Sequence, residues 1–386
     1  MLAELDAKVW DPERIVVVTD HYLPADDADS RKIIQITRDW VRDAGVRRFH
    51  DGEGICHIVL PENGYLQPGM FCVGGDSHSP TGGAFGSYIF GIGATEMLGA
   101  IVTGKIWLRI PQTIRLRFDG ALVDGVSAKD IMLMLIARFG LDGADYQVIE
   151  FAGTTIDAMT MQERMTLTNM SAELGAQTAL IAPDQTTADY LSLARARNPD
   201  RVAPDQTGLD RFSQWQGDVD APVAQQHSFD ASQLVPMVAA PDSPANSAPV
   251  TAHAGTPIAI AYIGACTGAK FDDLRMAARV LLGKRIADGV QLRVAPASAL
   301  DQRRAEQFGV LAALIDAGAT LLPTACGACA GYGQHRFAAG QTAIATTARN
   351  FKGRMGDSNS RVYLGSPYTV AASALTGVIT DPRQVL

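Results

Sequence analysis

Pro257-Ile-Ala-Ile-Ala-Tyr-Ile263 runs directly into the loop Gly264-Ala-Cys-Thr-Gly268, and a helical pattern of apolar residues follows from 271 to 282. A short apolar strand, a loop and a helix in this order are typical of α/β proteins. Repetition of this unit favours mainly parallel sheets, because parallel strands need a crossover between them. The stretch therefore predicts an α/β fold in which Cys266 directly follows a strand.

The same alternation is found earlier in the chain. Strand-like Ile15-Val-Val-Val18 precedes a helical spacing of apolar residues from Ser30 to Ala44, and Thr113-Ile-Arg-Leu-Arg-Phe118 precedes the helix-like stretch Ala128–Phe139. Strands that alternate with helices predict consecutive α/β/α units with mainly parallel sheets. We expect these units, with a site in the cleft between them, over residues 1–112, 113–235 and 236–386.

One long segment lacks this pattern. Between about Asn198 and Gly255 the chain is rich in Pro, Ala, Gln, Asp and Ser. This composition is typical of irregular connections. We expect the segment to have little core of its own.

Length and charge limit the function classes. The chain has 386 residues, 47% of them hydrophobic, and a net charge of −8. Its length is sufficient for two or three domains. The acidic balance and the lack of a Lys/Arg-rich run argue against nucleic acid and anionic membrane surfaces as partners. The uncharged stretch 77–95 is interrupted by proline and glycines, so it is no membrane span, and early charges argue against a signal peptide. Five cysteines, an odd number, suit a reducing cytoplasm.

Three cysteines form the most informative group. Cys266, Cys326 and Cys329 lie in glycine-bracketed loops with no fourth cysteine near them. Iron–sulfur clusters are normally held by four thiolates, so three would leave one iron open as a Lewis acid. Cys326-x-x-Cys329 alone is also compatible with a redox pair or half a zinc site, although structural zinc takes four ligands. Cys56 and Cys72 are interpreted as small buried hydrophobic residues.

A second group consists of acids and imidazoles. Asp20-His21 follows the apolar run 15–18, His57 follows Gly-Ile-Cys56, and Asp76-Ser-His78 follows Phe71-Cys-Val. Each lies at or near the end of a strand-like run, and ligands of α/β sheets bind outside the carboxyl ends of strands. We therefore expect these side chains to converge in an active site, where paired carboxylates and imidazoles supply acid and base groups.

Ordered sequence blocks carry a resemblance to a known family. The blocks are Thr19-Asp-His21, Gly54-Ile-Cys-His57, Gly75-Asp-Ser-His-Ser-Pro-Thr-Gly-Gly83, Gly91-Ile-Gly93, Asn169-Met-Ser-Ala-Glu-Leu-Gly-Ala176, Gly264-Ala-Cys-Thr-Gly268, Cys326-Gly-Ala-Cys329 and Arg349-Asn-Phe-Lys-Gly-Arg354. From about residue 15 to the C-terminus the chain resembles the aconitase superfamily. It is most similar to the large subunit of two-subunit 3-isopropylmalate dehydratases, a branch that includes homoaconitase-like and dimethylmalate dehydratase-like enzymes.

The resemblance implies a set of site residues. It implies a [4Fe–4S] cluster on Cys266, Cys326 and Cys329 with one iron not ligated by cysteine. It implies acid–imidazole pairs of Asp20 with His21, Asp76 with His57 and Glu173 with His78, in which His21 protonates the departing hydroxyl group. Arg349 and Arg354 match arginines around substrate carboxylates, and Ser77 and Asn169 match neighbours of the cluster and substrate. The remaining histidines, which match nothing and are interpreted as surface or structural residues, are His50, His227, His253 and His335.

The resemblance also implies an activity and a partner. The activity is dehydration or isomerisation of a small 2-hydroxy dicarboxylate, with 3-isopropylmalate as the first expectation and a methylated malate or a homoaconitate-type substrate as alternatives. A non-catalytic or iron-responsive binding protein is the alternative of another class. Because single-chain aconitases carry a further C-terminal domain with a serine base, we expect a separate small subunit of the swivelling-domain type over the cluster face.

Two departures from the family pattern concern the surroundings of the cysteines. Gly268 and Ala348 stand where relatives usually carry polar residues, in Ala265-Cys-Thr-Gly-Ala269 and Thr347-Ala-Arg-Asn350. Hydrogen bonds from outer residues tune a metal site, so cluster properties or substrate preference are expected to differ. Only nineteen residues precede Asp20, fewer than in relatives, which suggests an upstream start or a shortened member.

Overall fold

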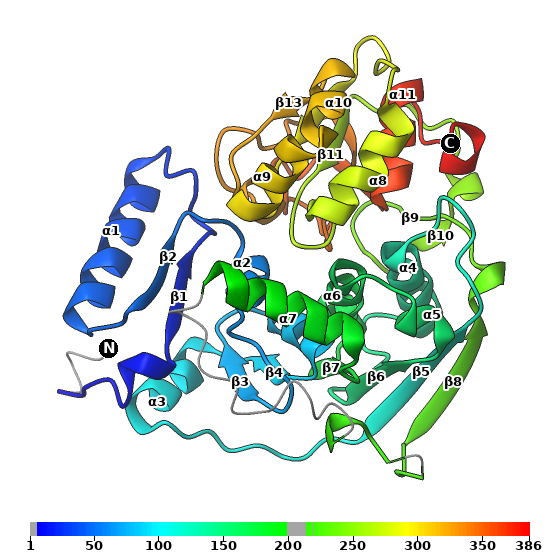
Figure 1. Cartoon of the computed structure of the whole chain (residues 1–386). Helices are drawn as coiled ribbons and strands as arrows, with labels where there is room; N and C mark the ends of the chain where they lie inside the picture. Colours follow the sequence, from blue (N-terminus) through cyan, green and yellow to red (C-terminus); the bar gives the residue numbers. More distant parts are fainter. Residues whose placement is uncertain (1–5, 199–213, 219) are drawn as a thin grey trace.

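The computed structural model describes residues 6–198, 214–218 and 220–386 (Figure 1). Strands and helices alternate along the chain, which confirms the predicted α/β class. The helices are α1 (Ala28–Asp43), α2 (Cys56–Glu62), α3 (Ala94–Thr103), α4 (Ala128–Phe139), α5 (Thr154–Asp157), α6 (Met161–Asn169), α7 (Gln185–Arg197), α8 (Phe271–Leu281), α9 (Ala299–Gln307), α10 (Val310–Asp316) and α11 (Pro367–Thr376).

The strands form four sheets that are mainly parallel. The two-stranded sheets pair β1 (Val16–Thr19) with β2 (Arg48–Asp51) and β3 (Phe71–Gly74) with β4 (Tyr88–Gly91). The four-stranded parallel sheet has the order β7 (Thr178–Ile181), β6 (Val148–Ala152), β5 (Thr113–Asp119), β8 (Gln225–Asp230). The seven-stranded sheet has the order β10 (Ser247–Pro249), β9 (Met237–Ala239), β15 (Arg361–Gly365), β14 (Thr342–Ala345), β11 (Ile260–Ile263), β12 (Gln291–Val294), β13 (Thr320–Leu321).

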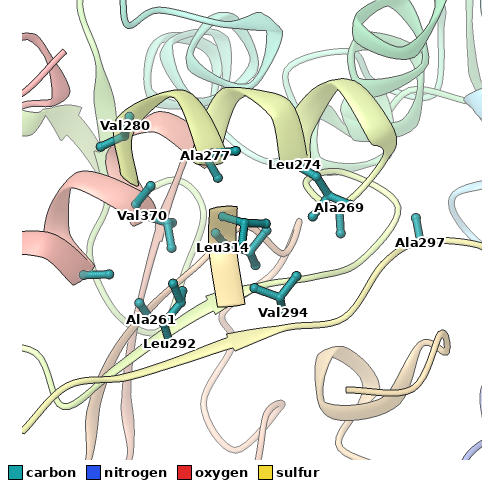
Figure 2. Packing of buried hydrophobic residues seen from close by; sticks show 14 of the residues in the cluster. Ala261, Ala269, Leu274, Ala277, Val280, Leu292, Val294, Ala297, Leu314 and Val370 are labelled. Carbon is teal, nitrogen blue, oxygen red and sulfur yellow. The ribbon is translucent and has the colours of Figure 1, made fainter. Parts of the chain in front are cut away.

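Packing of α8 on the seven-stranded sheet explains why the opening stretch folds as it does. Its apolar residues recur at helical spacing, so Leu274 and Ala277 lie on the side of α8 that faces the strands of Ala261 and Leu292 (Figure 2). Leu274 is completely buried. Burial of a leucine side chain contributes about 1.5–3 kcal/mol. The loop of Cys266 is therefore held between a buried strand and a well-packed helix.

The N-terminal region differs from the prediction at His57. We expected His57 near the end of a strand, but it lies in the first turn of α2. Gly54, with a φ of +137°, turns the chain beside Ser298, whose Cα would lie 2.5 Å from a Cβ on that glycine. The apolar run that follows is buried as a helix because Ile55 and Ile58 both face the core. The sequence prediction of a strand before His57 was therefore wrong, although the apolar residues are buried as their pattern indicates.

The segment from Asn198 to Gly255 is less irregular than predicted. Residues 199–213 and 219 lie outside the described residues, but β8 forms an edge of the four-stranded sheet, and β9 and β10 extend the seven-stranded sheet with antiparallel pairing. Met237, Val238 and Ala239 are buried. Composition missed these strands because a neighbouring strand satisfies their backbone groups, whatever polar side chains they carry.

The four sheets stay within the predicted residue limits of 1–112, 113–235 and 236–386. Packing nevertheless crosses these limits, since the 3₁₀-helix η3 (Ser79–Phe85) contacts α6 and β7. The division into three units therefore stays a prediction. Within the described ranges, no helix is both long and apolar enough to cross a membrane.

Candidate active site

The candidate site lies where the strand order of the seven-stranded sheet reverses. The chain proceeds from β11 outward through β12 to β13, then returns to β14 and β15 on the other side of β11. Such a reversal opens a crevice at the carboxyl ends of the strands, where ligands of α/β sheets bind. The loop after β11 carries Cys266, the loop after β14 carries Arg349, and η8 (Gly327–Ala330), after β13, carries Cys329.

The three cysteine thiols are drawn together at this edge. Cys266 and Cys329 are buried, and Cys326 is partly buried. Cys326 and Cys329 are joined by a side-chain hydrogen bond, which lowers the pKa of Cys329, with help from the Arg354 charge. Asn169, at the end of α6, donates from Nδ2 to the Cys266 sulfur at 3.2 Å. Burial, followed by the charge of Cys329, raises the pKa of Cys266 to about 12.

The departure at Gly268 has a steric explanation. A Cβ on Gly268 would lie 2.1 Å from the Cβ of Thr346. The Thr346 hydroxyl accepts a hydrogen bond from the Gly264 backbone nitrogen at 2.9 Å and donates to its carbonyl oxygen at 2.8 Å. Thr346 thus occupies the space that a larger side chain at position 268 would need, and its hydroxyl group binds the backbone of the Cys266 loop. Ala348 is buried in an apolar core cluster that also contains Leu364.

Asp76 connects the predicted imidazoles. Its Oδ1 lies 2.7 Å from His57 Nε2, and its Oδ2 lies 3.4 Å from His21 Nε2. The other ring nitrogen of His21 lies 2.6 Å from Asp20 Oδ1. His78 Nδ1 lies 3.6 Å from Asp76 Oδ1. Three imidazoles from different elements therefore converge on one carboxylate.

These contacts shift the pKa values in opposite directions. Hydrogen bonds that His21 donates to Asp20 and then to Asp76 raise the pKa of His21 to about 10. Burial opposes protonation of His78, but the charge of Glu173 and the hydrogen bond to Asp76 outweigh it and raise the pKa of His78 to about 9. Burial also acts to raise the pKa of Asp76, yet hydrogen bonds from the three histidines lower it. At neutral pH the site therefore holds imidazolium groups against carboxylates.

Glu173 extends this network toward Arg349. It lies in η4 (Met170–Leu174), and its Oε1 is 3.0 Å from His78 Nε2 and 2.6 Å from Arg349 Nε. Its Oε2 is buried without a hydrogen-bond partner in the described part of the chain, as are Asn169 Oδ1 and Arg354 Nε. Buried polar atoms normally have a partner. Three unpartnered polar atoms beside the thiols and Arg349 fit a site that binds a polar or charged group.

The two groups form one site. The Cys326 backbone nitrogen donates to the Asp20 carbonyl oxygen at 3.3 Å, and the Cys56 nitrogen donates to Asp20 Oδ2 at 2.8 Å. The pairs Asp20–His21, Asp76–His57 and Glu173–His78 are all in contact, although their roles stay predictions. Ser77 is exposed next to Asp76. His50 is fully buried on Glu53 and Tyr65, a structural position.

Comparison with known proteins agrees with this geometry. Residues 1–377 match the aconitase family (aconitate hydratase). The chain belongs to the aconitase family. A 3-isopropylmalate dehydratase large subunit of Methanopyrus kandleri is 42% identical over 98% of this chain and 88% of its own. A probable methanogen homoaconitase large subunit of Methanothermobacter thermautotrophicus is also 42% identical, over 98% of this chain and 86% of its own.

Among solved structures, the holo form of Thermococcus kodakaraensis aconitase X covers 90% of this chain and 77% of its own, with a TM-score of 0.49 and 11% identity. Membership of the aconitase family and the dehydratase names of its relatives make this chain a hydro-lyase, an enzyme that breaks a carbon–oxygen bond by elimination.

Two sets of side chains in this aconitase-family site could hold metal. The ligand atoms of His57, Asp76 and His78 all lie within 4.8 Å of one another, and in the described residues they are the one such group. Each already takes part in the hydrogen-bonded network. Among the described residues the three cysteines do not form such a group within 4.8 Å, and thiolates are the usual ligands of a cluster of several irons. Their burial and the unpartnered atoms around them fit such a group.

Sequence analysis missed two buried lysines beside the cysteine loop. Lys129 lies in the first turn of α4, and Lys270 precedes α8 directly after that loop. Both are buried. A signal was present, because Lys129 and Asp130 are charges in the helix-like stretch Ala128–Phe139, which is otherwise apolar up to Arg138. A charge in an apolar helix indicates a buried and partnered group.

Proposed function

We propose that this chain is the large subunit of a [4Fe–4S]-dependent dehydratase or isomerase of a small 2-hydroxy dicarboxylate, of the 3-isopropylmalate type that serves leucine biosynthesis. The observation that carries the proposal is the direct junction of the two groups, in which Cys326 binds the Asp20 backbone while Asp20 holds His21. Elimination of water next to a carboxylate needs a proton donor, a base and a cation in one place.

The cysteines Cys266, Cys326 and Cys329 would hold the cluster. When bound, it would supply an open iron that acts as a Lewis acid toward the hydroxyl and carboxylate oxygens of the substrate. Asn169 would keep the Cys266 sulfur in place through its 3.2 Å hydrogen bond. Ser77, exposed beside Asp76, would face the substrate.

His21 would act as the proton donor to the departing hydroxyl group. Its raised pKa, about 10, keeps the ring protonated at neutral pH. Its side chain is 35% exposed, so a substrate can reach it. Asp20 and Asp76 each contact one ring nitrogen of His21 and therefore fix the orientation of the ring. His57, His78 and Glu173 would keep Asp76 and the neighbouring guanidinium group in position.

Arg349 and Arg354 would bind the substrate carboxylates. Glu173 holds Arg349 through Nε, so the terminal nitrogens of Arg349 are the part that a carboxylate can meet. The planar fork of an arginine matches two carboxylate oxygens. Arg354 interacts with the Cys329 thiol rather than with a carboxylate among the described residues. Both arginines thus border the predicted position of the substrate.

A separate small subunit would complete the site. The relatives reported above are named as large subunits, and we infer that a small chain of the swivelling-domain type supplies the base. The relatives' names also leave a homoaconitate-type substrate as the main alternative to 3-isopropylmalate, with a methylated malate as another. We place the enzyme in the cytoplasm, since the cluster chemistry needs free thiols.

The test is an assay of the reconstituted complex. The chain is co-expressed with the small subunit, loaded anaerobically with iron and sulfide, and screened for enoate absorbance over a series of malate derivatives. We expect an absorbance rise with one substituted malate in the wild type and in the His335→Ala control. Absence of enoate from every malate, despite a full complement of cluster, would contradict the proposal.

A further inference from the structure

Lys129 places a positive charge behind the cysteine loop. Its side chain is 1% exposed, and it enters from α4, in a different part of the sequence from the loops that it contacts. Its Nζ donates to the carbonyl oxygens of Thr346 and Thr347, both at 2.7 Å, and to the Thr267 hydroxyl at 3.4 Å. All three acceptors are neutral. Lys129 therefore gains hydrogen bonds from the site loops but no counter-charge.

The carboxylates near Lys129 are already matched by other cations. These carboxylates are Asp273 and Glu173, and their negative charges act to raise the pKa of Lys129. Asp273 lies 2.6 Å from Lys270 Nζ, and Glu173 is bound to His78 and Arg349. Among the described residues, no carboxylate lies within ion-pair distance of Lys129. Its burial lowers its pKa to about 8, while the charge of Cys266 acts in the opposite direction.

Lys270 is the contrasting case on the same loop. It is also fully buried, and its Nζ donates to the Cys266 carbonyl oxygen at 3.0 Å. Unlike Lys129, it has a carboxylate partner in Asp273. A buried charge is normally paired. Lys129, the lysine without a carboxylate partner, thus indicates that an anion binds on the opposite side of the Cys266 loop.

We propose that Lys129 is the buried counter-charge of the anionic group held at Cys266. This inference rests on the proposed function, in which that group is a [4Fe–4S] cluster on three thiolates. A cluster core with two positive charges and three thiolates carries one net negative charge, and uptake of one electron adds a second. A fixed cation in a buried environment favours the more negative state. Lys129 therefore raises the reduction potential of the cluster and helps retain it.

Two variants separate the charge of Lys129 from its hydrogen bonds. Lys129→Gln removes the charge but keeps an N–H donor for the threonine carbonyl oxygens, whereas Lys129→Arg keeps the charge. The reconstituted holo-protein is titrated anaerobically with dithionite, and the reduced cluster is followed by electron paramagnetic resonance. We expect the equilibrium constant for one-electron reduction to fall about tenfold or more in Lys129→Gln, a shift of about 59 mV to more negative potential. Lys129→Arg should stay close to the wild type.

Iron content is measured in the same samples. If Lys129→Gln loses cluster, restoration of iron by Lys129→Arg supports the inference. Equal potentials in wild type and Lys129→Gln, or equal shifts or equal iron loss in both variants, would overturn it and leave Lys129 as a structural residue. A wild-type chain that takes up no cluster would instead overturn the proposed function on which the inference rests.

Discussion

The imidazole side and the cysteine side of the site are built differently. On the imidazole side, Asp20, Asp76 and Glu173 meet His21, His57 and His78 directly, at 2.6 to 3.6 Å. On the cysteine side, Asn169 Oδ1 and Arg354 Nε are buried without partners in the described chain, as is Glu173 Oε2 on the imidazole side. No carboxylate of the described residues lies within ion-pair distance of Lys129. The first side holds itself together through its own charges. The second side keeps buried polar atoms without partners among these residues, and the proposed anionic group would complete it.

This difference indicates that cluster binding and proton transfer can be disrupted separately. Side chains that hold one another should keep their arrangement when the cysteines are changed. Loops that need a bound group should depend on it for their order. Loss of cluster and loss of proton transfer are therefore expected to be independent defects in this chain.

The largest expected effect concerns the catalytic base, which we assign to neither side of the site. If a small subunit supplies the base, the isolated chain should turn over no substrate even when it is fully loaded with iron. Turnover is measured with and without the purified small chain, at equal iron content. Full activity of the isolated chain would show that both sides together already make a complete site.

Removal of His21 tests the imidazole side alone. His21→Ala should reduce turnover by about a hundredfold or more, the usual scale for a general acid, because the protonated ring next to Asp20 and Asp76 is lost. Iron content should not change. The matched control is His335→Ala, which should leave turnover near wild type. Equal loss of activity in both variants, or iron loss in His21→Ala, would contradict the assigned role.

Gly268→Ala tests the cysteine side without a change of charge. A Cβ at this position would lie 2.1 Å from the Thr346 Cβ, and overpacking of this kind costs about 1–3 kcal/mol. We expect a lower free energy of unfolding and a smaller iron content. Gly99→Ala in α3 is the control, because a Cβ there meets nothing within 4 Å. A fully stable, fully loaded Gly268→Ala protein would refute the close packing.

The smallest expected effect is the pH dependence of stability without cluster. The pKa values of His21 and His78 are raised from 6.5 to about 10 and about 9. Their stabilisation is therefore complete below pH 6.5 and is lost as the pH rises through 9 to 10. Urea unfolding at several pH values measures this. Asp76→Asn should flatten the alkaline decline, and an unchanged decline would argue against the network.

The sequence predicted the parts of the fold that depend on local pattern. Helix α4 begins and ends at the predicted residues, and β11 leads into the Cys266 loop as expected. His57 was placed on the wrong element because an apolar run of this length suits a strand or a buried helix equally well. The edge strand β8 was missed because its pairing with β5 depends on distant residues.

For the site, sequence motifs marked the residues to which we assign the chemistry, but not those that support them. The three acid–imidazole pairs could be named because each belongs to a recognisable block. The charge of Lys129 and the space filled by Thr346 depend on contacts between segments 79 to 218 residues apart, and no local spacing encodes them. Such residues become visible only when the loops are placed together.

The most direct test of the central claim is the iron content of five cysteine variants. Each cysteine is changed to serine singly, and every chain is reconstituted anaerobically and analysed for iron, sulfide and visible absorbance. Cys266→Ser, Cys326→Ser and Cys329→Ser should each lose most of the iron, whereas Cys56→Ser and Cys72→Ser should keep it. Equal iron retention in all five variants would contradict a cluster held by three thiolates beside the imidazole network.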